Sequence, residues 1–522
     1  MGQKRAAEAT GAASAETKRE IERKYEATGE TRLPDLTRAK GVATVRPHGV
    51  TALDAVYYDT ADLRLAADSL TLRRRTGGAD AGWHLKFPVA AGVRDEIRAP
   101  LSDTLPRSLA GLLRSRVRTT PVHPVVRLRS RRDVHHLHAA DGALLAEVSV
   151  DTVHAERLAG CSGRTAEWTE IEVELADDAD PAVLDAVEKR LAKAGVVPSS
   201  APSKLARALA ETGAPAPAPP PPADLRTAGT AGTAVLAYVR RQADALVRLD
   251  PAVRRDLPDA VHRMRVACRR LRSTLRTYGK VLDRTVTDPL GAELRWLAGE
   301  LGAARDLEVL DERLLAALDA LPRDLVAGPA HRRLKAWAAT HGAGSRRRAL
   351  DALDSPRHLA LLTRIDALLT DPPLLPAAHR DAGKVLRKAV LRDHRRLAHR
   401  VEHALALAPG PERDHALHDA RKAAKRARYA AEAAAPVLGK PARRLVRRMK
   451  RLQDCLGDHQ DSVVARAALA DLAEQTAAAG EPAFTWGVLY GREEAAAADR
   501  ERELPDLWSR SFAPRFRAAR GH

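Results

Sequence analysis

The 522-residue sequence contains few aromatic residues and few cysteines. Phe, Trp and Tyr make up 3% of the chain, and Cys161, Cys268 and Cys455 are scattered without a CxxC pair. Proteins that bind single-stranded nucleic acids stack bases on aromatic side chains, so the low aromatic content argues against that class. Three scattered cysteines argue against a disulfide framework and a cysteine-ligated metal site, as is usual in a reducing cytoplasm.

Long apolar runs are also absent. No apolar stretch approaches the ~20 residues that are needed to span a bilayer. The N-terminal sequence MGQKRAAEATGAASAETKRE lacks the apolar segment of a secretory signal. We therefore expect a cytoplasmic protein with no membrane partner.

Positive charge, in contrast, is abundant. The chain has 87 Lys and Arg residues against 68 Asp and Glu, which gives a formal net charge of +19. This balance favours a polyanionic partner, and nucleic acid, polyphosphate and anionic membrane would each qualify. Because aromatic residues are scarce, a phosphate chain without bases is favoured over a specific nucleic acid. A general bias toward Arg and Ala is the alternative explanation of the charge.

A Pro-, Ala- and Gly-rich segment, residues 212–233, divides the chain into two regions that differ in composition and in the periodicity of their apolar residues. Before it, short runs rich in Val, Thr, Tyr and Ile predict antiparallel strands, and helices are expected over 180–195 and from Ser203. After it, Ala/Leu/Arg-rich segments with a period near 3.6 predict only helices, about eight to ten of them. The fold class is therefore α+β multidomain. We expect a disordered tail over 1–17, a strand domain over 18–211 and a helical domain over 234–515.

Charged residues alternate along the predicted strands. In KREIERKYEAT, residues 18–28, Glu20, Glu22 and Lys24 occupy every second position and therefore share one face of a strand. An inward row of charges is costly unless the charges are paired or coordinate a ligand. The same alternation recurs at Arg73 and Arg75, at Lys86, at Arg94 and Glu96, and at Glu170, Glu172 and Glu174.

If these strands close into a barrel, its interior is lined by charges of both signs. Carboxylates supply the oxygen ligands that Mg²⁺ or Mn²⁺ prefers, while Arg and Lys hold phosphate oxygens. The pattern thus favours a polyphosphate bound with a metal. An antiparallel sheet with one solvated face is the alternative, because such a sheet also alternates polar and apolar residues.

These motifs carry a resemblance to a known family. Glu20-x-Glu22-x-Lys24, YYDT (57–60), LTLRRR (70–75), Lys86, EIEVE (170–174) and SKLARAL (203–209) together resemble the CYTH, or triphosphate tunnel metalloenzyme, family over residues 18–211. The resemblance implies an eight-stranded antiparallel tunnel with flanking helices. It also implies that the tunnel binds triphosphate and a divalent metal ion, Mg²⁺ or Mn²⁺.

The resemblance also implies roles for single residues, with Glu20, Glu22 and Lys24 as the catalytic motif. The implied substrate-binding cations are Lys24, Arg73, Arg75, Lys86, Arg94, Lys204 and either Arg129 or Arg132. Arg132 is favoured, although the alternation does not settle that choice. The implied metal-binding and water-activating acids are Glu20, Glu22, Asp151, Glu170, Glu172 and Glu174, with the register of the last three open by two residues.

Activities in this family include hydrolysis of inorganic triphosphate or thiamine triphosphate, removal of RNA 5′-triphosphates and adenylate cyclisation. All of them share attack at phosphorus, with metal and cations neutralising the phosphates. The strands show no aromatic cluster that would form a pocket for a base, although Tyr57, Tyr58 and Trp83 are available. Inorganic triphosphate is therefore the expected substrate.

The helical region repeats itself. HRMRVACRRLRSTLRTY, from His262, aligns with HDARKAAKRARYAAEAA, from His418, and LGxxxD follows in both copies at Asp306 and Asp461. The basic residues step by three or four and so share one helical face. Like charges at that spacing repel, which favours a bound polyanion. A solvated basic face would explain either copy alone. Two helical bundles about a pseudo-twofold axis are expected.

The repeated elements resemble the CHAD family, named for conserved histidines in an α-helical domain, over residues 231–515. The resemblance implies two bundles that form a basic groove for inorganic polyphosphate. The implied polyphosphate-binding residues are His262, Arg265, Arg269, Arg272, His418, Arg421, Lys425 and Arg428. Lys384 and Lys388 are added from the stepped sequence 383–400, and Asp306 and Asp461 are expected to orient the cations.

The expected function combines both halves. It is a metal-dependent inorganic triphosphatase tethered to a polyphosphate-binding module, which would raise the local concentration of phosphate chain ends near the tunnel. Association with polyphosphate granules is a hypothesis that follows from this resemblance. The alternatives are a non-catalytic polyphosphate-binding protein, a CYTH enzyme that acts on an organic triphosphate, and a basic RNA-binding protein.

Overall fold

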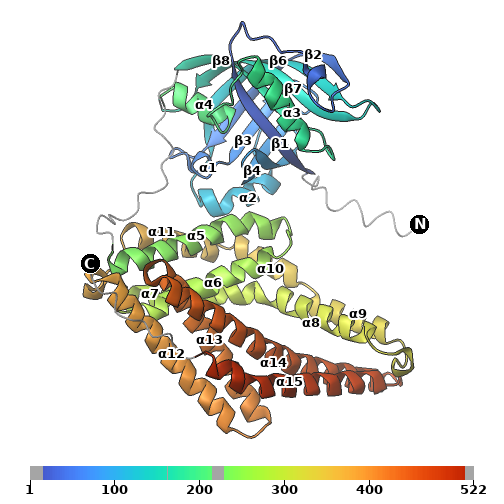
Figure 1. Ribbon diagram of the computed structural model, residues 1–522, viewed down its shortest axis with the longest axis vertical. Coiled ribbons are helices and arrows are strands. Elements are labelled where there is room, and N and C mark those ends of the chain that lie inside the picture. Colours follow the sequence, from blue (N-terminus) through green and yellow to red (C-terminus); the bar gives the residue numbers. More distant parts are fainter. Residues whose placement is uncertain (1–15, 161–162, 214–228, 512–522) are drawn as a thin grey trace. The chain divides into compact units, whose positions relative to one another are not determined.

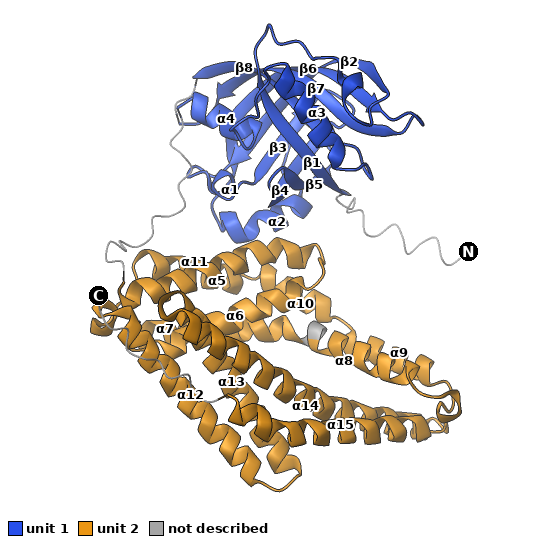
Figure 2. Ribbon diagram, viewed as in Figure 1, with its two compact units in different colours: residues 1–221 blue, residues 222–522 orange. Residues whose placement is uncertain are grey.

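The computed structural model describes residues 16–160, 163–213 and 229–511, apart from a few side chains. The chain divides into two compact units, residues 1–221 and 222–522 (Figure 2). Nearly all of the expected disordered tail, most of the expected linker, and Cys161 lie outside the described residues. The first strand begins at Glu16 and the first helix of the second unit at Ala231, slightly before the expected domain starts at 18 and 234.

The first unit contains a closed antiparallel barrel (Figure 1). Its strands are β1 (Glu16–Ala27), β2 (Thr44–Asp59), β3 (Thr71–Thr76), β4 (Gly82–Ala90), β5 (Val93–Ala99), β6 (His123–His138), β7 (Leu144–Arg157) and β8 (Thr165–Leu175). They pair in the order β1-β5-β4-β3-β2-β6-β7-β8 and close into a ring. The expected eight-stranded antiparallel tunnel is thereby confirmed.

Short helices pack against the barrel. They are η1 (Leu36–Arg38), α1 (Arg64–Ala67), α2 (Arg107–Val117), α3 (Ala182–Lys193) and α4 (Lys204–Glu211). Buried residues of α3, such as Leu184 and Val187, pack on Val148 and Val173 of the strands. The apolar residues of these strands therefore face outward to the helices, which leaves the alternating charged residues facing inward. The helices expected over 180–195 and from Ser203 are confirmed as α3 and α4.

One glycine is required where the barrel closes. The Glu22 backbone N–H donates to the Gly92 carbonyl oxygen at 2.9 Å, which joins the β4–β5 turn to β1. Gly92 has a φ of +68°, and a Cβ at this position would lie 2.8 Å from the Glu22 carbonyl oxygen. Only glycine adopts this conformation without strain, so it allows the turn to approach β1 closely.

The second unit is helical in the part of the chain that is described. Its α-helices are α5 (Ala231–Arg254), α6 (Ala260–Thr277), α7 (Arg284–Glu300), α8 (Gly302–Asp319), α9 (Ala330–Gly342), α10 (Ser345–Asp354), α11 (Pro356–Thr370), α12 (Ala382–Ala406), α13 (Pro411–Leu438), α14 (Lys440–Ala478) and α15 (Phe484–Ser509). Two short 3₁₀ helices, η2 (Arg323–Leu325) and η3 (Pro376–His379), connect them. The α-helices α5 to α15 outnumber the expected eight to ten. Gly344 and the Ser355 cap before Pro356 divide one region into the short helices α9, α10 and α11.

The two copies of the repeat fall on α6 and α13. Their buried residues, including Met264, Leu271, Leu417 and Ala424, belong to a common hydrophobic core. Downstream, α14 is continuous, whereas the equivalent segment of the first copy is divided into α7 and α8 at Leu301. Among the helices that the structure describes, none has both the length and the apolar character required to cross a membrane.

Candidate functional site

A cavity of about 180 Å³ occupies the interior of the barrel. It is lined by Lys18, Glu20, Glu22, Lys24, Tyr57, Thr71, Arg73, Arg75, Asp80, Lys86, Arg94, Arg98, Arg132, Glu147, Glu172, Glu174, Ser203 and Lys204. Most of the residues expected in the tunnel are therefore brought together. Asp151 and Glu170 are buried beside this lining and contact Lys204.

Strand register explains how so many charges are buried together. On neighbouring strands, Glu20 lies opposite Arg94 and Lys24 lies opposite Glu172. Arg132 lies opposite Asp151 on β7. Opposite charges thus meet across the ladder, which offsets part of the cost of removing them from water.

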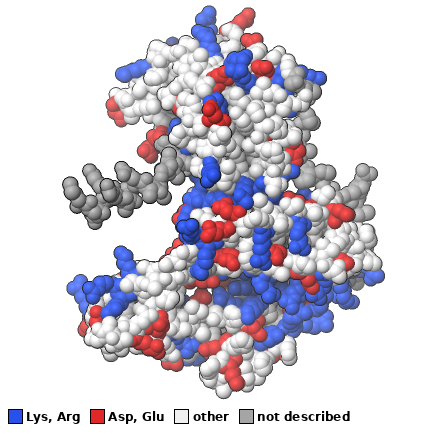
Figure 3. All heavy atoms as spheres, turned by 180° about the vertical axis from the view of Figure 1, so that it is seen from behind, with Lys and Arg blue, Asp and Glu red and all other residues white. Residues whose placement is uncertain are grey.

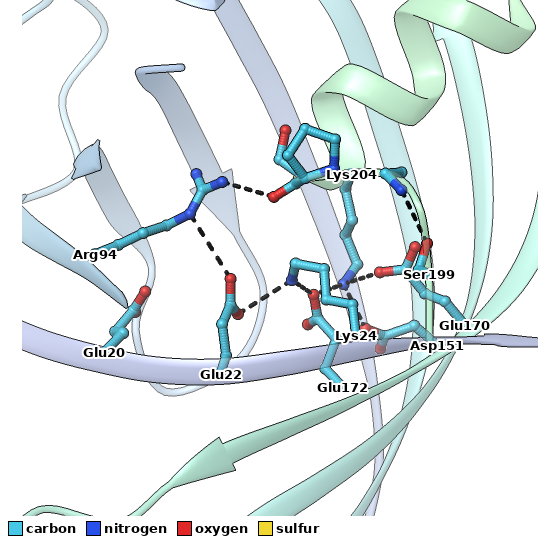
Figure 4. A network of polar contacts seen from close by, with 12 residues as sticks. Glu20, Glu22, Lys24, Arg94, Asp151, Glu170, Glu172, Ser199 and Lys204 are labelled. Carbon is cyan, nitrogen blue, oxygen red and sulfur yellow. Dashed lines mark hydrogen bonds and ion pairs between the residues drawn. The ribbon is translucent and has the colours of Figure 1, made fainter. Parts of the chain in front are cut away.

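Three carboxylates form a buried cluster at one side of the cavity. Oxygen atoms of Asp151, Glu170 and Glu172 lie within 4.8 Å of one another. The Lys204 Nζ lies 2.9 Å from Asp151 and 2.6 Å from each glutamate (Figure 4). Arg132 is 2.7 Å from both Asp151 and Glu172. Burial alone would raise the pKa of Glu172, but Lys204, Lys24 and Arg132 hold it well below its usual value.

This acidic cluster fits a divalent metal ion. Carboxylate oxygens are the hard ligands that Mg²⁺ and Mn²⁺ prefer, and CYTH tunnel enzymes generally use divalent metals. Lys204 and Arg132 now supply the positive charge that a metal ion would bring. Asp151, Glu170 and Glu172 could therefore hold a metal ion together with phosphate oxygens, and Glu20 and Glu22 lie along the same cavity.

The two acids of the β1 motif differ in environment. Glu20 lies 2.5 Å from the Lys86 Nζ, and burial raises its pKa despite that lysine. Glu22 lies 3.1 Å from the Lys24 Nζ and 3.9 Å from the Arg94 Nε (Figure 4). Burial would raise the pKa of Glu22, but Lys24, Lys86 and Lys204 together lower it. Glu20 is thus the better proton acceptor of the two.

Arginines crowd the opposite side of the cavity. The Arg73 guanidinium lies 3.6 Å from Glu96, and Arg75 forms an ion pair with Asp80. Burial, together with Arg73 and Arg132, lowers the pKa of Arg75 to about 9. In the described part of the chain, the buried Nε atoms of Arg73 and Arg75 have no hydrogen-bond partner. A bound phosphate would supply the missing acceptors.

The structure separates Arg129 from Arg132. Arg132 lines the cavity, whereas Arg129 is exposed on the same strand and lies 3.9 Å from Glu156. The two arginines are three positions apart and so point to opposite faces of β6. The structure therefore does not bring Arg129 into the tunnel. Glu174 lines the cavity next to Lys18, 2.7 Å away, apart from the acidic cluster.

Sequence reasoning left several tunnel residues out of the candidate site. Glu96 is fully buried, lies 2.9 Å from the His84 Nδ1 and 3.5 Å from the Lys86 Nζ, and pairs with Arg98. Lys18 and Arg98 also line the cavity. The alternation of charged residues along β1 and β5 could have indicated these positions. It extends to Lys18 on β1, and from Arg94 through Glu96 to Arg98 on β5.

On the helical unit, each copy of the repeat builds the same contact. Arg265 donates to Asp306 at 2.8 and 3.0 Å, and Arg421 lies 3.6 Å from Asp461. A Cβ at Gly302 would lie 3.1 Å from the Arg265 Nη2. The matching Cβ at Gly457 would lie 3.4 Å from the Arg421 Nη2. The glycine and aspartate of LGxxxD thus make room for the arginine and orient it.

Four cations from α6 and α13 form what we call the basic cluster: Arg265, Arg269, Arg421 and Lys425. Burial, together with Arg421 and Arg269, lowers the pKa of Lys425 to about 7. The Nε atoms of all three arginines are buried without a hydrogen-bond partner among the described residues. Figure 3 shows Lys and Arg side chains gathered in a hollow of the helical unit. Like charges from α6 and α13 are thus held close together.

Other residues expected to bind polyphosphate have different surroundings. The Arg428 guanidinium donates to Glu432 at 2.8 Å and to Gln453 at 3.1 Å. The pKa of Arg272 is lowered by burial and by Arg295. His262 is exposed, whereas His418 is half-buried with its Nδ1 lacking a hydrogen-bond partner in the described part. Lys384 and Lys388 are exposed on α12.

These features define a class. A closed barrel whose interior combines a carboxylate cluster with phosphate-binding cations is typical of tunnel enzymes of phosphoryl transfer. The model of the CYTH domain matches residues 18–209, and the CYTH family includes triphosphatases and cyclases. The model of the CHAD domain matches residues 237–470. The chain belongs to the family of proteins that join a CYTH domain to a CHAD domain in one polypeptide.

The chain is similar to a curated relative and to solved structures. "Uncharacterized protein Rv2226" of Mycobacterium tuberculosis (strain ATCC 25618 / H37Rv) is 39% identical over 525 residues, covering 96% of this chain and 98% of its own length. The structure of PptA from Streptomyces chartreusis is 26% identical and covers 54% of this chain and 99% of its own, with a TM-score of 0.45. The CHAD domain from the plant Ricinus communis is also 26% identical and covers 55% and 94%, with a TM-score of 0.44.

Proposed function

We propose that the barrel is a metal-dependent hydrolase of inorganic triphosphate and that the helical unit binds inorganic polyphosphate. The observation that carries the proposal is the composition of the tunnel cavity. Buried carboxylates face it from one side and Arg73, Arg75 and Lys86 from the other. Among the described residues that line it, Tyr57 is the one aromatic, so it offers little stacking surface for a base or a thiazole ring.

In this mechanism the arginines and lysines bind the phosphate oxygens. Arg73 and Arg75 each have a free Nε donor, in the described part of the chain, for a chain of phosphates that lies along β3. Asp151, Glu170 and Glu172 would hold the metal ion, Mg²⁺ or Mn²⁺, which would polarise a phosphoryl oxygen when bound. Glu20, whose pKa is raised by burial, would accept a proton from the attacking water.

In the helical unit, the basic cluster would bind the polyphosphate chain. Two of its four cations pair with Asp306 and Asp461, and the buried guanidinium Nε donors and the lowered pKa of Lys425 support an excess of positive charge. A polyanion lying across α6 and α13 would supply that negative charge. Association with polyphosphate granules would follow from the same contact.

One observation favours a second candidate function. Lys204 and Arg132 already neutralise the acidic cluster, so the tunnel would be stable as a site that holds a phosphate chain without cleaving it. The protein would then be a non-catalytic polyphosphate-binding protein. An organic triphosphate as substrate remains a variant of the first proposal.

Phosphate release from tripolyphosphate, thiamine triphosphate and ATP with Mg²⁺ or Mn²⁺ tests the proposal. We expect release from tripolyphosphate to exceed release from the two organic substrates and to be abolished by Glu22→Ala and by Arg73→Ala. Glu167→Ala, at an exposed position of β8, is the matched control and should leave release unchanged. Phosphate release that does not depend on a metal ion would contradict the proposed triphosphatase activity. So would the absence of phosphate release from all three substrates.

A further inference from the structure

His84 of β4 is a buried histidine that has no role in the proposed mechanism. Its side chain is 1% exposed and does not line the tunnel cavity. The Nδ1 atom lies 2.9 Å from a Glu96 carboxylate oxygen, and the Nε2 atom lies 2.9 Å from the Asp80 carbonyl oxygen. The imidazole therefore joins β5, which carries Glu96, to the β3–β4 turn, which carries Asp80.

The Glu96 oxygen that His84 contacts is shared with two of the cations proposed to bind phosphate. This oxygen, Oε1, lies 3.6 Å from the Arg73 Nη2 and 3.5 Å from the Lys86 Nζ, and Glu96 is fully buried. Strand register brings the groups together, because Arg73 lies opposite His84 across the β3–β4 ladder. Lys86 likewise lies opposite Glu96 across the β4–β5 ladder. His84 thus fixes the carboxylate that both cations contact.

The other contact of His84 reaches the third of these cations. Asp80 lines the cavity, and its carboxylate forms an ion pair with Arg75. The turn that carries Asp80 includes Gly77 and Gly78, whose φ values are +80° and +73°. Because glycine leaves the backbone many accessible conformations, a contact from outside the turn is what holds it in place. The contact of His84 with the Asp80 carbonyl oxygen does this and so fixes the partner of Arg75.

We propose that His84 is a positioning residue that aims these three cations at one phosphate chain by holding Glu96 and Asp80 in place. The inference rests on the proposed function, in which the three cations bind the phosphate oxygens. Binding groups must be held in the productive geometry, because a misplacement of about 1 Å can lower a rate about 100-fold. His84 acts from outside the cavity and touches no substrate atom.

Three substitutions separate the two contacts of His84. His84→Phe fills a similar space and removes both contacts. The amide nitrogen introduced by His84→Asn can take the place of Nδ1 and keep the contact with Glu96. The amide nitrogen introduced by His84→Gln can take the place of Nε2 and keep the contact with Asp80. We expect His84→Phe to raise the KM for tripolyphosphate at least about tenfold and to lower kcat, and the other two variants to recover part of this loss.

His135→Phe is the matched control for these kinetics. His135 also lies beside an acid, 3.5 Å from Asp133, but it is three positions from Arg132 and so points to the opposite face of β6. KM and kcat should therefore stay as in wild type.

Equilibrium binding of tripolyphosphate without a metal ion gives a readout that does not require turnover. Isothermal titration calorimetry is carried out in the Arg269→Ala/Lys425→Ala background, which lacks two cations of the basic cluster. His84→Phe should weaken binding at least about tenfold. If wild type releases no phosphate but this loss of binding is found, the proposed hydrolase activity is wrong and the positioning role stands.

The positioning role is overturned if His84→Phe is folded by circular dichroism and binds and turns over tripolyphosphate like wild type. It is also overturned if His84→Asn and His84→Gln lose as much as His84→Phe, because the loss would then not follow the two contacts. A wild-type protein that neither binds nor hydrolyses tripolyphosphate would overturn both the positioning role and the proposed hydrolase.

Discussion

Two buried lysines illustrate the difference between the barrel and the helical unit. In the barrel, Lys204 lies within 2.9 Å of three carboxylates, and these outweigh burial and raise its pKa. In the helical unit, burial lowers the pKa of Lys425 to about 7, and Arg421 and Arg269 add to the effect. The same side chain is thus shifted in opposite directions by its neighbours.

On the proposed function, this difference separates catalysis in the barrel from retention of polyphosphate on the helices. The barrel interior is neutralised by its own pairs, so it can keep charges of both signs in place before any ligand arrives, as a preorganised catalytic site requires. The basic cluster keeps uncompensated positive charge on its surface. On the proposed function it would attract and hold a polyanion, and its two acids, Asp306 and Asp461, are engaged by Arg265 and Arg421.

The largest expected effect is on the barrel. Glu172→Gln removes a carboxylate that contacts Lys24, Arg132 and Lys204 and belongs to the acidic cluster. We expect tripolyphosphate turnover to fall at least about 100-fold, because charge stabilisation and metal binding are both lost. Steady-state phosphate release measures it, with Glu167→Gln on the outer face as the control. Turnover within a few-fold of wild type would remove the acidic cluster from the reaction.

The second-largest expected effect is a loss of polyphosphate affinity when the basic cluster is changed. Arg269→Ala/Lys425→Ala removes two of its four cations. We expect affinity for long-chain polyphosphate to fall at least about 100-fold, since each charge-assisted contact contributes about 1.5–3 kcal/mol. Equilibrium binding of labelled polyphosphate measures the loss. Lys335→Ala/Arg347→Ala removes two exposed cations of α9 and α10 and should change affinity only slightly. Equal losses in both variants would mean that net charge alone attracts the chain.

Much of what distinguishes the barrel from the helical unit could be predicted from the sequence. Glu20, Glu22 and Lys24 predicted an inward charged face. Asp306 and Asp461 were expected to orient the cations of the two repeats, and they lie beside Arg265 and Arg421. What the sequence could not supply was the pairing of strands. Arg129 and Arg132 could be assigned to faces only once Arg132 was found opposite Asp151.

Other roles depended on contacts between neighbouring elements of the fold. Asp59 belongs to the YYDT motif, but it is buried and accepts the backbone N–H groups of Leu65 and Ala66, so it holds α1 rather than lining the cavity. From the sequence, His84 is an ordinary strand residue. In the structure, its Nδ1 lies 2.9 Å from a Glu96 carboxylate oxygen. No local pattern indicates such partners, because they come from separate strands and turns.

Ionic strength should separate the two regions without any mutation. Binding to the basic cluster releases counterions from polyphosphate, so we expect affinity to fall about tenfold or more when salt rises from 50 to 200 mM, roughly as for other polyanions. Pairs in the tunnel are buried and screened less, so the KM for tripolyphosphate should rise by a smaller factor. Titrating salt in both assays measures this, and parallel slopes would contradict the distinction.

The smallest expected effect is a pH dependence that arises at Lys425. In the free protein its pKa is about 7, and a bound polyanion raises that pKa. Binding therefore takes up a proton above pH 7, and affinity should fall several-fold as pH rises above 7. Lys425→Arg keeps the charge and should flatten this dependence in polyphosphate binding measured between pH 6 and about 9. An unchanged pH profile in Lys425→Arg would assign the effect to another group.

The most direct test of the account measures both activities on the same protein samples. Wild type, Glu172→Gln and Arg269→Ala/Lys425→Ala are each assayed for metal-dependent phosphate release from tripolyphosphate and for retention of long-chain polyphosphate. The account predicts that Glu172→Gln loses release but keeps retention, and that the double variant loses retention but keeps release. Loss of both activities together in either variant would contradict the separation of catalysis in the barrel from binding on the helices.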